Sequence, residues 1–132
     1  MALAITEPTV EVASTSNATS YAMGAFTPTA NSLLVCMVFA SGTTAAGTMS
    51  GGGLTWTRRQ SILYNTTDTA YLFTAPVGAS PASTTPTFDC TCDNATGVVM
   101  MIWQVTGFNL GITQTDAEAR TAANVGVVTP AR

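Results

Sequence analysis

Short apolar runs separated by turn-forming residues are the feature that most limits the folds open to this chain. Runs rich in Thr, Val, Tyr, Phe and Trp alternate with clusters of Gly, Pro, Asn and Ser. No segment keeps the i, i+3, i+4, i+7 apolar spacing of an amphipathic helix, and Glu, Lys, Arg and Gln are scarce. About eight strands with turns every ~8–12 residues therefore predict an all-β fold, an antiparallel β-sandwich or jelly roll.

The individual strands follow from these runs. We expect them at 9–13, 21–26, 33–40, 54–62, 70–75, 87–92 and 98–105, with a hairpin turn at 65–68. The runs 33–40 and 98–105 are almost unbroken in apolar residues, which is typical of central strands buried on both faces. Residues 42–53 are expected to form a loop because Gly, Thr, Ala and Ser dominate the segment and three of the glycines are consecutive.

The length of 132 residues predicts one folded domain, which we place at 15–110. Residues 1–14 are expected to form an N-terminal strand or arm. Residues 111–132 are polar, and Val125, Val127 and Val128 form their main apolar cluster. This C-terminal segment is expected to be either an edge strand or an extended arm, so the fold would carry extended terminal arms.

The charge composition excludes several classes of protein. The chain has no Lys, no His and only four Arg, which is too few cations for sequence-independent binding to nucleic acid. The absence of His removes the commonest general base and the commonest metal ligand, so we expect no enzyme, no metal and no cofactor. The longest apolar run is far shorter than the ~20 residues that span a bilayer, so we expect no membrane partner.

The low content of charged residues points towards an assembly. Only 8% of the residues are charged, whereas a free soluble domain usually carries more charge on its surface. A subunit that buries much of its surface against neighbours does not need that charge. The composition therefore favours a component of an assembly.

The three cysteines are best explained by burial. Three thiols without His do not complete a tetrahedral metal site, and free Cys is among the most buried residue types. The alternative is a disulfide from Cys36 to Cys90 or Cys92. The residues expected to form the core are Leu34, Cys36, Val38, Trp56, Phe88, Cys90, Val99, Met101 and Trp103.

Two further groups of residues have both a structural and a functional interpretation. Arg58 and Arg59 are the only adjacent cations, and they must point to opposite faces of a strand, so they cannot form one patch. We expect one of them to pair with an acid on a neighbouring strand or subunit, and the alternative is contact with an anionic ligand. Trp56 and Tyr64 are candidates for a sugar-stacking platform if they are exposed, although alternation with Leu54 indicates a core position for Trp56.

Several segments occur in an order that resembles a known group. These are 25–35, 50–59, 69–77, the turn at 93–97 and 104–108. Together they resemble small β-sandwich virion structural proteins of tailed bacteriophages, across roughly 15–110. The resemblance implies either a capsid decoration (cement) protein or a module of a tail or fibre protein. It carries over no catalytic motif.

We therefore expect a structural virion protein, a phage capsid decoration protein that is made in the host cytoplasm and binds the outer capsid surface. It would act as a homotrimer, contact the major capsid protein and stabilise the shell. The alternative is a tail or fibre module that recognises glycan or a protein partner. The candidate intersubunit contacts are Ile5, Val10, Val12, Arg58, Arg59, Val125, Val127 and Val128.

Overall fold

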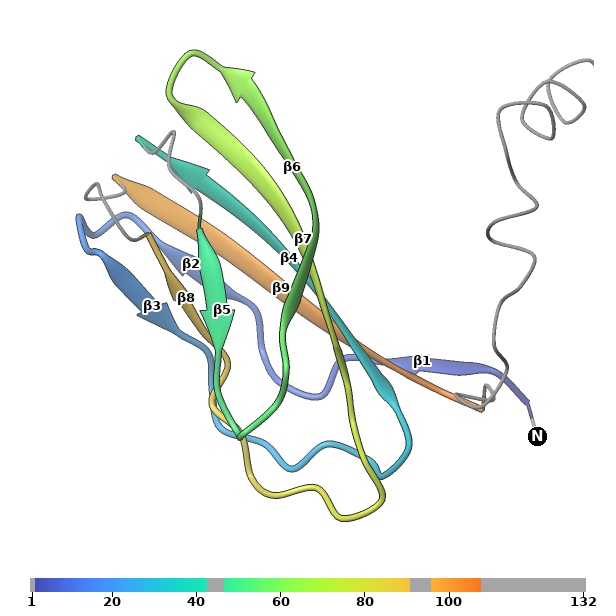
Figure 1. The fold of residues 1–132 in the computed structure, drawn as a ribbon. Coiled ribbons are helices and arrows are strands. Elements are labelled where there is room, and N and C mark those ends of the chain that lie inside the picture. Colours follow the sequence, from blue (N-terminus) through green and yellow to red (C-terminus); the bar gives the residue numbers. More distant parts are fainter. Residues whose placement is uncertain (1, 43–46, 91–95, 108–132) are drawn as a thin grey trace, which may run out of the picture.

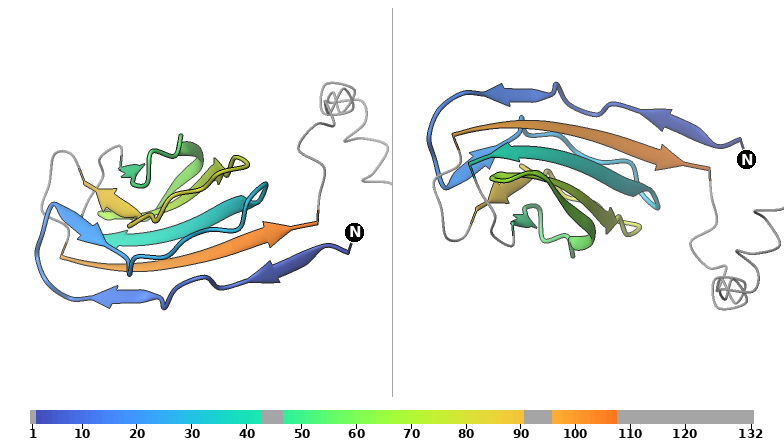
Figure 2. Two further views of the ribbon diagram at one scale, coloured as in Figure 1. Left: turned by 90° about the horizontal axis from the view of Figure 1, so that it is seen from below. Right: turned by 90° about the horizontal axis from the view of Figure 1, so that it is seen from above.

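A computed structural model describes residues 2–42, 47–90 and 96–107 of the chain. Within these ranges the protein is all-β, with nine strands in two antiparallel sheets (Figure 1). The two sheets form two layers, as the views in Figure 2 show. The predicted all-β sandwich is confirmed.

The large sheet has the strand order β1-β9-β4-β7-β6, and β2 also pairs with β9. All its pairs are antiparallel, and β4 is the central strand. Its strands are β1 (Ala4–Thr6), β2 (Val12–Ser14), β4 (Leu33–Ser41), β6 (Thr57–Asn65), β7 (Asp68–Pro76) and β9 (Gly97–Thr106). The predicted hairpin turn lies between β6 and β7.

The small sheet covers one face of the large sheet. It has the order β3-β8-β5, with β3 at Ser20–Ala22, β5 at Thr48–Ser50 and β8 at Thr87–Asp89. The side chains that face inward from both sheets form one core, in which the rings of Tyr71, Phe73 and Phe88 are in mutual contact, with centroids 5.2 to 6.2 Å apart.

The sequence-based boundaries differ from the structure in several places, and the strand expected at 21–26 is the shorter Ser20–Ala22. Thr48–Ser50 forms β5 inside the segment expected to be a loop, because its backbone pairs with β8 and its Met49 side chain is buried. The three glycines at 51–53 do form the turn that follows, all with positive φ. The strand expected at 54–62 begins only at Thr57, and the strand expected at 9–13 begins at Val12.

The described N-terminal residues belong to the sandwich and do not form a free arm. The two short strands β1 and β2 lie one after the other along the same edge of β9, and each pairs with a different part of it. Ala4–Thr6 and Val12–Ser14 are therefore strands of the large sheet. The C-terminal segment 111–132 lies outside the described residues.

Candidate interaction surface

The most distinctive surface of the molecule is the face of the large sheet that points away from the small sheet. We call it the outer face. Its central side chains come from β4, β7 and β9, and they are Val35, Met37, Phe39, Leu72, Val99, Met101, Trp103 and Val105. No strand of the described ranges covers this face, because the small sheet lies on the other side (Figure 2).

The alternation along β4 shows why this face is unusual. Leu34, Cys36 and Val38 point inward and are fully buried, whereas the intervening side chains point outward and are half-buried. A sheet with one solvated face normally alternates apolar-in with polar-out. In β4 both sets are apolar, which is the pattern of a sheet that is covered on both sides.

Three residues expected in the core lie on the outer face, and this expectation is wrong for them. Val99 is 37% exposed, and Met101 and Trp103 are half-buried. The reason is the two-residue period of a strand, since Val98, Met100 and Ile102 take the inward positions of β9. The other expected core residues, except Trp56, are fully buried: Leu34, Cys36, Val38, Phe88 and Cys90.

The polar residue in the β9 run is held inside the sandwich. Gln104 is buried, and its Nε2 donates a hydrogen bond to the Thr29 hydroxyl at 2.9 Å. The backbone N–H of Thr29 donates in return to Gln104 Oε1 at 2.7 Å. This pair satisfies the amide on the inner face. The outward-facing positions of β9 after Gly97 are all apolar: Val99, Met101, Trp103 and Val105.

Each end of the outer face has a shallow hollow. One, of about 280 Å³, is lined by Ile5, Val35, Trp103 and Val105, and Ile5 at its rim is 63% exposed. The other, of about 450 Å³, lies at the opposite end of β4. It is lined by Phe39 and Val99 together with the 55% exposed ring of Tyr64 and several hydroxyl side chains: Ser14, Thr15, Ser41 and Thr96.

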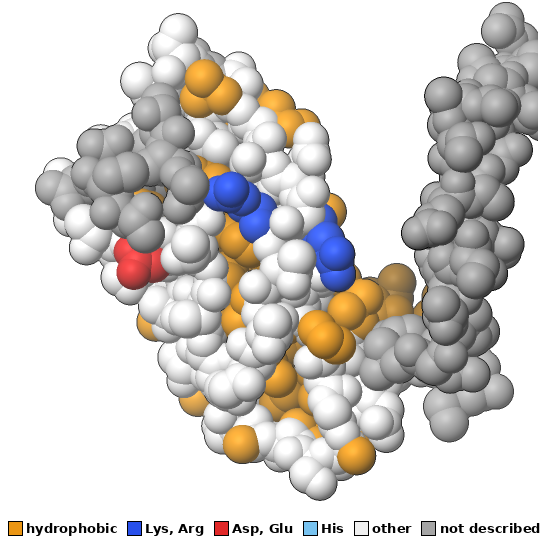
Figure 3. Space-filling view, viewed as in Figure 1, with side chains coloured by type: hydrophobic (Ala, Val, Ile, Leu, Met, Phe, Trp, Pro, Cys, Tyr) orange, Lys and Arg blue, Asp and Glu red, His pale blue; other side chains and the backbone are white. Residues whose placement is uncertain are grey.

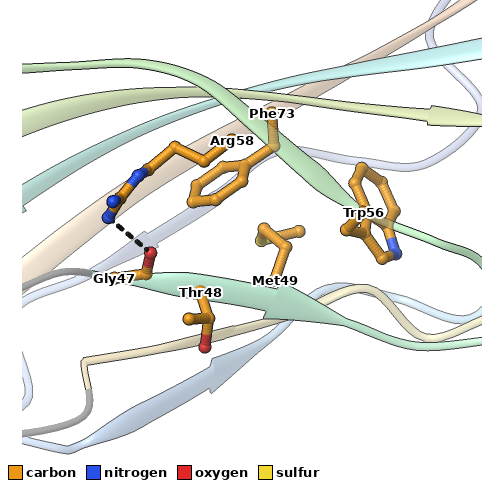
Figure 4. Close-up of a pocket in the computed structure, with 6 residues that line it drawn as sticks. All are labelled: Gly47, Thr48, Met49, Trp56, Arg58 and Phe73. Carbon is orange, nitrogen blue, oxygen red and sulfur yellow. Dashed lines mark hydrogen bonds between the residues drawn. The ribbon is translucent and has the colours of Figure 1, made fainter.

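A third hollow, of about 370 Å³, lies at the open edge of the sandwich between β5 and β6 (Figure 4). Arg58 extends across it and donates from its guanidinium to the backbone carbonyl of Gly47 at 3.3 Å. Trp56 is half-buried and packs against the core, and its buried Nε1 has no hydrogen-bond partner. Phe73 and Met49 form the apolar floor. Trp56 thus lies at the margin of the core rather than inside it.

Arg58 and Arg59 point to different sides of β6, as the strand geometry predicts. Arg58 is opposite the inward-facing Phe73, whereas the Arg59 Nε donates to the Thr74 hydroxyl at 2.7 Å. A shift in pairing between Arg58 and Gln60 places this contact at a β-bulge. Figure 3 shows the basic side chains in two separate places, so they make no continuous cationic patch.

The remaining candidate contacts are distributed unevenly. Val10 is 81% exposed in the connection between β1 and β2. Val12 is partly buried and packs on the core of its own chain, because its cross-strand partner is the inward-facing Met100. Val125, Val127 and Val128 lie outside the described residues.

The thiol of Cys36 is unreactive at neutral pH. Cys36 is a free thiol in the core, and burial raises its pKa to about 12. The expected alternative of a disulfide from Cys36 is therefore not formed. Cys90 is also buried, on β8's side of the core, and Cys92 lies outside the described residues. A thiol with so high a pKa is not a nucleophile at neutral pH.

The described residues contain no group of three His, Cys, Asp or Glu side chains that could hold a metal ion. In the same ranges there is no helix with the length and hydropathy needed to cross a membrane. The chain matches no known protein-family model, no curated protein and no solved structure.

Proposed function

We propose that this protein is a structural virion protein that decorates the outside of a phage head. The observation that supports this most directly is the outer face, a broad uncharged apolar surface on a compact sandwich. Such a surface is suited to lasting contact between proteins, because exposed apolar patches of this kind mark interaction sites. The resemblance of segments within 15–110 to virion structural proteins of tailed phages directs the proposal to the virion, and decoration of the head is the first of the two roles that it implies.

In this role the protein adds buried interface to an assembled shell. A ligand that binds the assembled state and not the dissociated capsid protein stabilises the assembled state by mass action. The protein is made in the host cytoplasm, assembles with copies of itself, as a homotrimer in the simplest arrangement, and binds the major capsid protein on the outer capsid surface. Its low charge suits a subunit with several buried contacts.

Co-sedimentation tests this proposal. The purified full chain is mixed with empty heads of the phage that encodes it, and the heads are pelleted over a range of protein concentrations. We expect saturation at a fixed ratio to capsid protein and a higher temperature of head disruption. If the protein stays in the supernatant at every concentration, the decoration role is wrong.

A matched pair of variants locates the capsid contact. Val10 is highly exposed and leaves the core intact when changed, so Val10→Asp should weaken attachment if the N-terminal side contacts the shell. Ala22→Asp introduces the same charge on an exposed position of β3, on the other sheet, and should bind as the wild type does. Equal loss in both variants would indicate a general charge effect and not a contact at Val10.

A tail or fibre module that binds glycan is the second candidate, and Tyr64 is the observation that favours it. Its exposed ring lies in a hollow with Phe39 and several hydroxyl groups, which suits stacking and hydrogen bonding to a sugar. A glycan array with the full chain should then give binding that Tyr64→Phe retains and Tyr64→Ala loses. Ser61→Ala, at an exposed position on the same strand, is the control.

A further inference from the structure

We infer that the hollow between β5 and β6 is a binding site for a carboxylate that is joined to an apolar group, with Arg58 as the residue that binds the carboxylate. We call it the Arg58 hollow, and its lining residues are Gly47, Thr48, Met49, Trp56, Arg58 and Phe73. It lies at the edge between the two sheets and not on the outer face, so the inference goes beyond the proposed function and does not rest on it. Both a free organic acid and an acidic residue of a partner protein offer this chemistry.

Arg58 occupies an unusual position for a charged side chain. Its cross-strand neighbour is Phe73, which faces inward and is 2% exposed, so Arg58 extends from the inner side of β6. Inward positions of a sandwich are normally apolar, because they pack against the other sheet. Arg58 is nevertheless exposed, since the small sheet ends at β5 and the edge between β5 and β6 is open. The shift in pairing after Arg58 is a β-bulge, a feature that re-aims side chains at the edges of sheets.

The positive charge of Arg58 has no acidic partner within the described ranges. Its guanidinium makes one hydrogen bond there, to the neutral backbone carbonyl of Gly47 at 3.3 Å. The acidic residues of these ranges are Glu7, Glu11, Asp68 and Asp89. The pairing with an acid that the sequence predicts for one of the two arginines is therefore not seen for Arg58 among these residues. A guanidinium has five N–H donors, so most of them are left for a ligand.

The charged and apolar parts of the hollow are separated in space. Figure 4 shows the guanidinium at one end and the Trp56 ring at the other, with Phe73 and Met49 between them. The volume of about 370 Å³ is near the lower end of the range for small-ligand pockets, which is about 300–1,000 Å³. A ligand that matches this layout has an apolar body over the ring side chains and an anionic group at Arg58.

A carboxylate fits this site better than a phosphate group does. The hollow offers a single positive charge, since the neighbouring Arg59 has its Nε bonded to Thr74 on the other side of β6. One guanidinium neutralises one carboxylate, and the two planar groups can form two parallel hydrogen bonds. A phosphate monoester carries close to two negative charges at neutral pH, so part of its charge would remain unpaired beside apolar side chains.

Binding of hydrocinnamate, a phenyl ring joined to a carboxylate by a short chain, tests the inference. The isotope-labelled full chain is titrated with this probe, and nuclear magnetic resonance follows the Arg58 Nε–H and Trp56 Nε1–H signals. We expect both signals to shift and to saturate, whereas the indole signal of Trp103, on the outer face, should move much less. The neutral hydrocinnamyl alcohol should bind about tenfold or more weakly, because it offers no charge-assisted hydrogen bond.

Three arginine variants separate a site at Arg58 from a general effect of charge. Arg58→Met keeps an unbranched apolar chain over Phe73 and removes the charge, so the affinity for hydrocinnamate should fall about tenfold or more. Arg58→Lys keeps the charge and loses the planar fork, and it should retain part of the affinity. Arg59→Met removes the same charge from the adjacent residue and should bind hydrocinnamate as the wild type does. Far-UV circular dichroism verifies that each variant is folded.

Three results would each overturn the inference: no saturable shift at Arg58 in the wild type, equal affinity for the acid and the alcohol, or equal losses in Arg58→Met and Arg59→Met. Attachment to phage heads distinguishes the two sources of the carboxylate. Weaker attachment of Arg58→Met than of Arg59→Met assigns the ligand to an acidic residue of the capsid protein, and equal attachment assigns it to a free organic acid. A wild-type chain that binds hydrocinnamate but not heads would retain the site and remove the proposed decoration role.

Discussion

The neighbouring methionines of β9 allow the two faces of the large sheet to be compared with identical chemistry. Met100 is fully buried between the sheets, and Met101 is half-buried on the outer face. Met100→Ala removes a buried side chain and leaves a cavity, which costs about 2–5 kcal/mol of the free energy of unfolding. Met101→Ala removes a partly hydrated side chain and leaves no closed cavity, so we expect about 1 kcal/mol or less in the monomer.

Urea unfolding of both variants at low protein concentration, where copies are separated, measures this difference. With a slope of about 1–3 kcal/mol/M, the midpoint for Met100→Ala should fall by about 1 M or more, while that for Met101→Ala should move little. Equal costs for the two variants at low concentration would refute the assignment of the faces.

Three other perturbations follow from single contacts. Burial raises the pKa of Cys36 to about 12 in the folded protein, so this thiol ionises first in the unfolded chain, at pH values above its ordinary pKa of 9.0. The free energy of unfolding should therefore fall as the pH rises above 9.0, and thermal melting should show a smaller alkaline decline in Cys36→Ala. Gln104→Leu should cost about 1–3 kcal/mol in urea unfolding because the Thr29 N–H loses its acceptor, and no measurable cost would mean that water replaces the amide. Gly47→Ala would place its Cβ against a buried aromatic ring and should cost about 1–3 kcal/mol, whereas Gly78→Ala has open space and should be neutral in the same melting assay.

The sequence predicts the sandwich well because its long strands carry strong local signals. The apolar run at 33–40 forms β4, and the turn at 65–68 joins β6 to β7 as expected. Thr48–Ser50 could not be predicted as a strand, since a segment of only three residues, Thr-Met-Ser beside a glycine cluster, carries too little local signal. Their strand geometry comes from pairing with β8, which is distant in sequence.

The orientation of β9 was the part of the candidate site that the sequence could not determine. When both faces of a strand are apolar, the period of two gives no sign of which set points inward. Gln104 even suggests the wrong set, because a lone polar residue normally faces water, yet here it points inward to Thr29. Its long-range partner lies 75 residues away, which no local pattern indicates.

The two margins of the large sheet differ in a way that bears on aggregation. On the β9 side, the short strands β1 and β2 cover the margin, and Glu7, Pro8 and Glu11 lie in or beside the connection between them. Charges and proline of this kind discourage the addition of a foreign strand. On the other side, β6 presents nine residues of edge backbone interrupted by two shifts in pairing, with Ile62 and Tyr64 exposed near its end. Among the described strands of this sheet, unwanted growth into fibrils would therefore begin along β6 and extend in one direction.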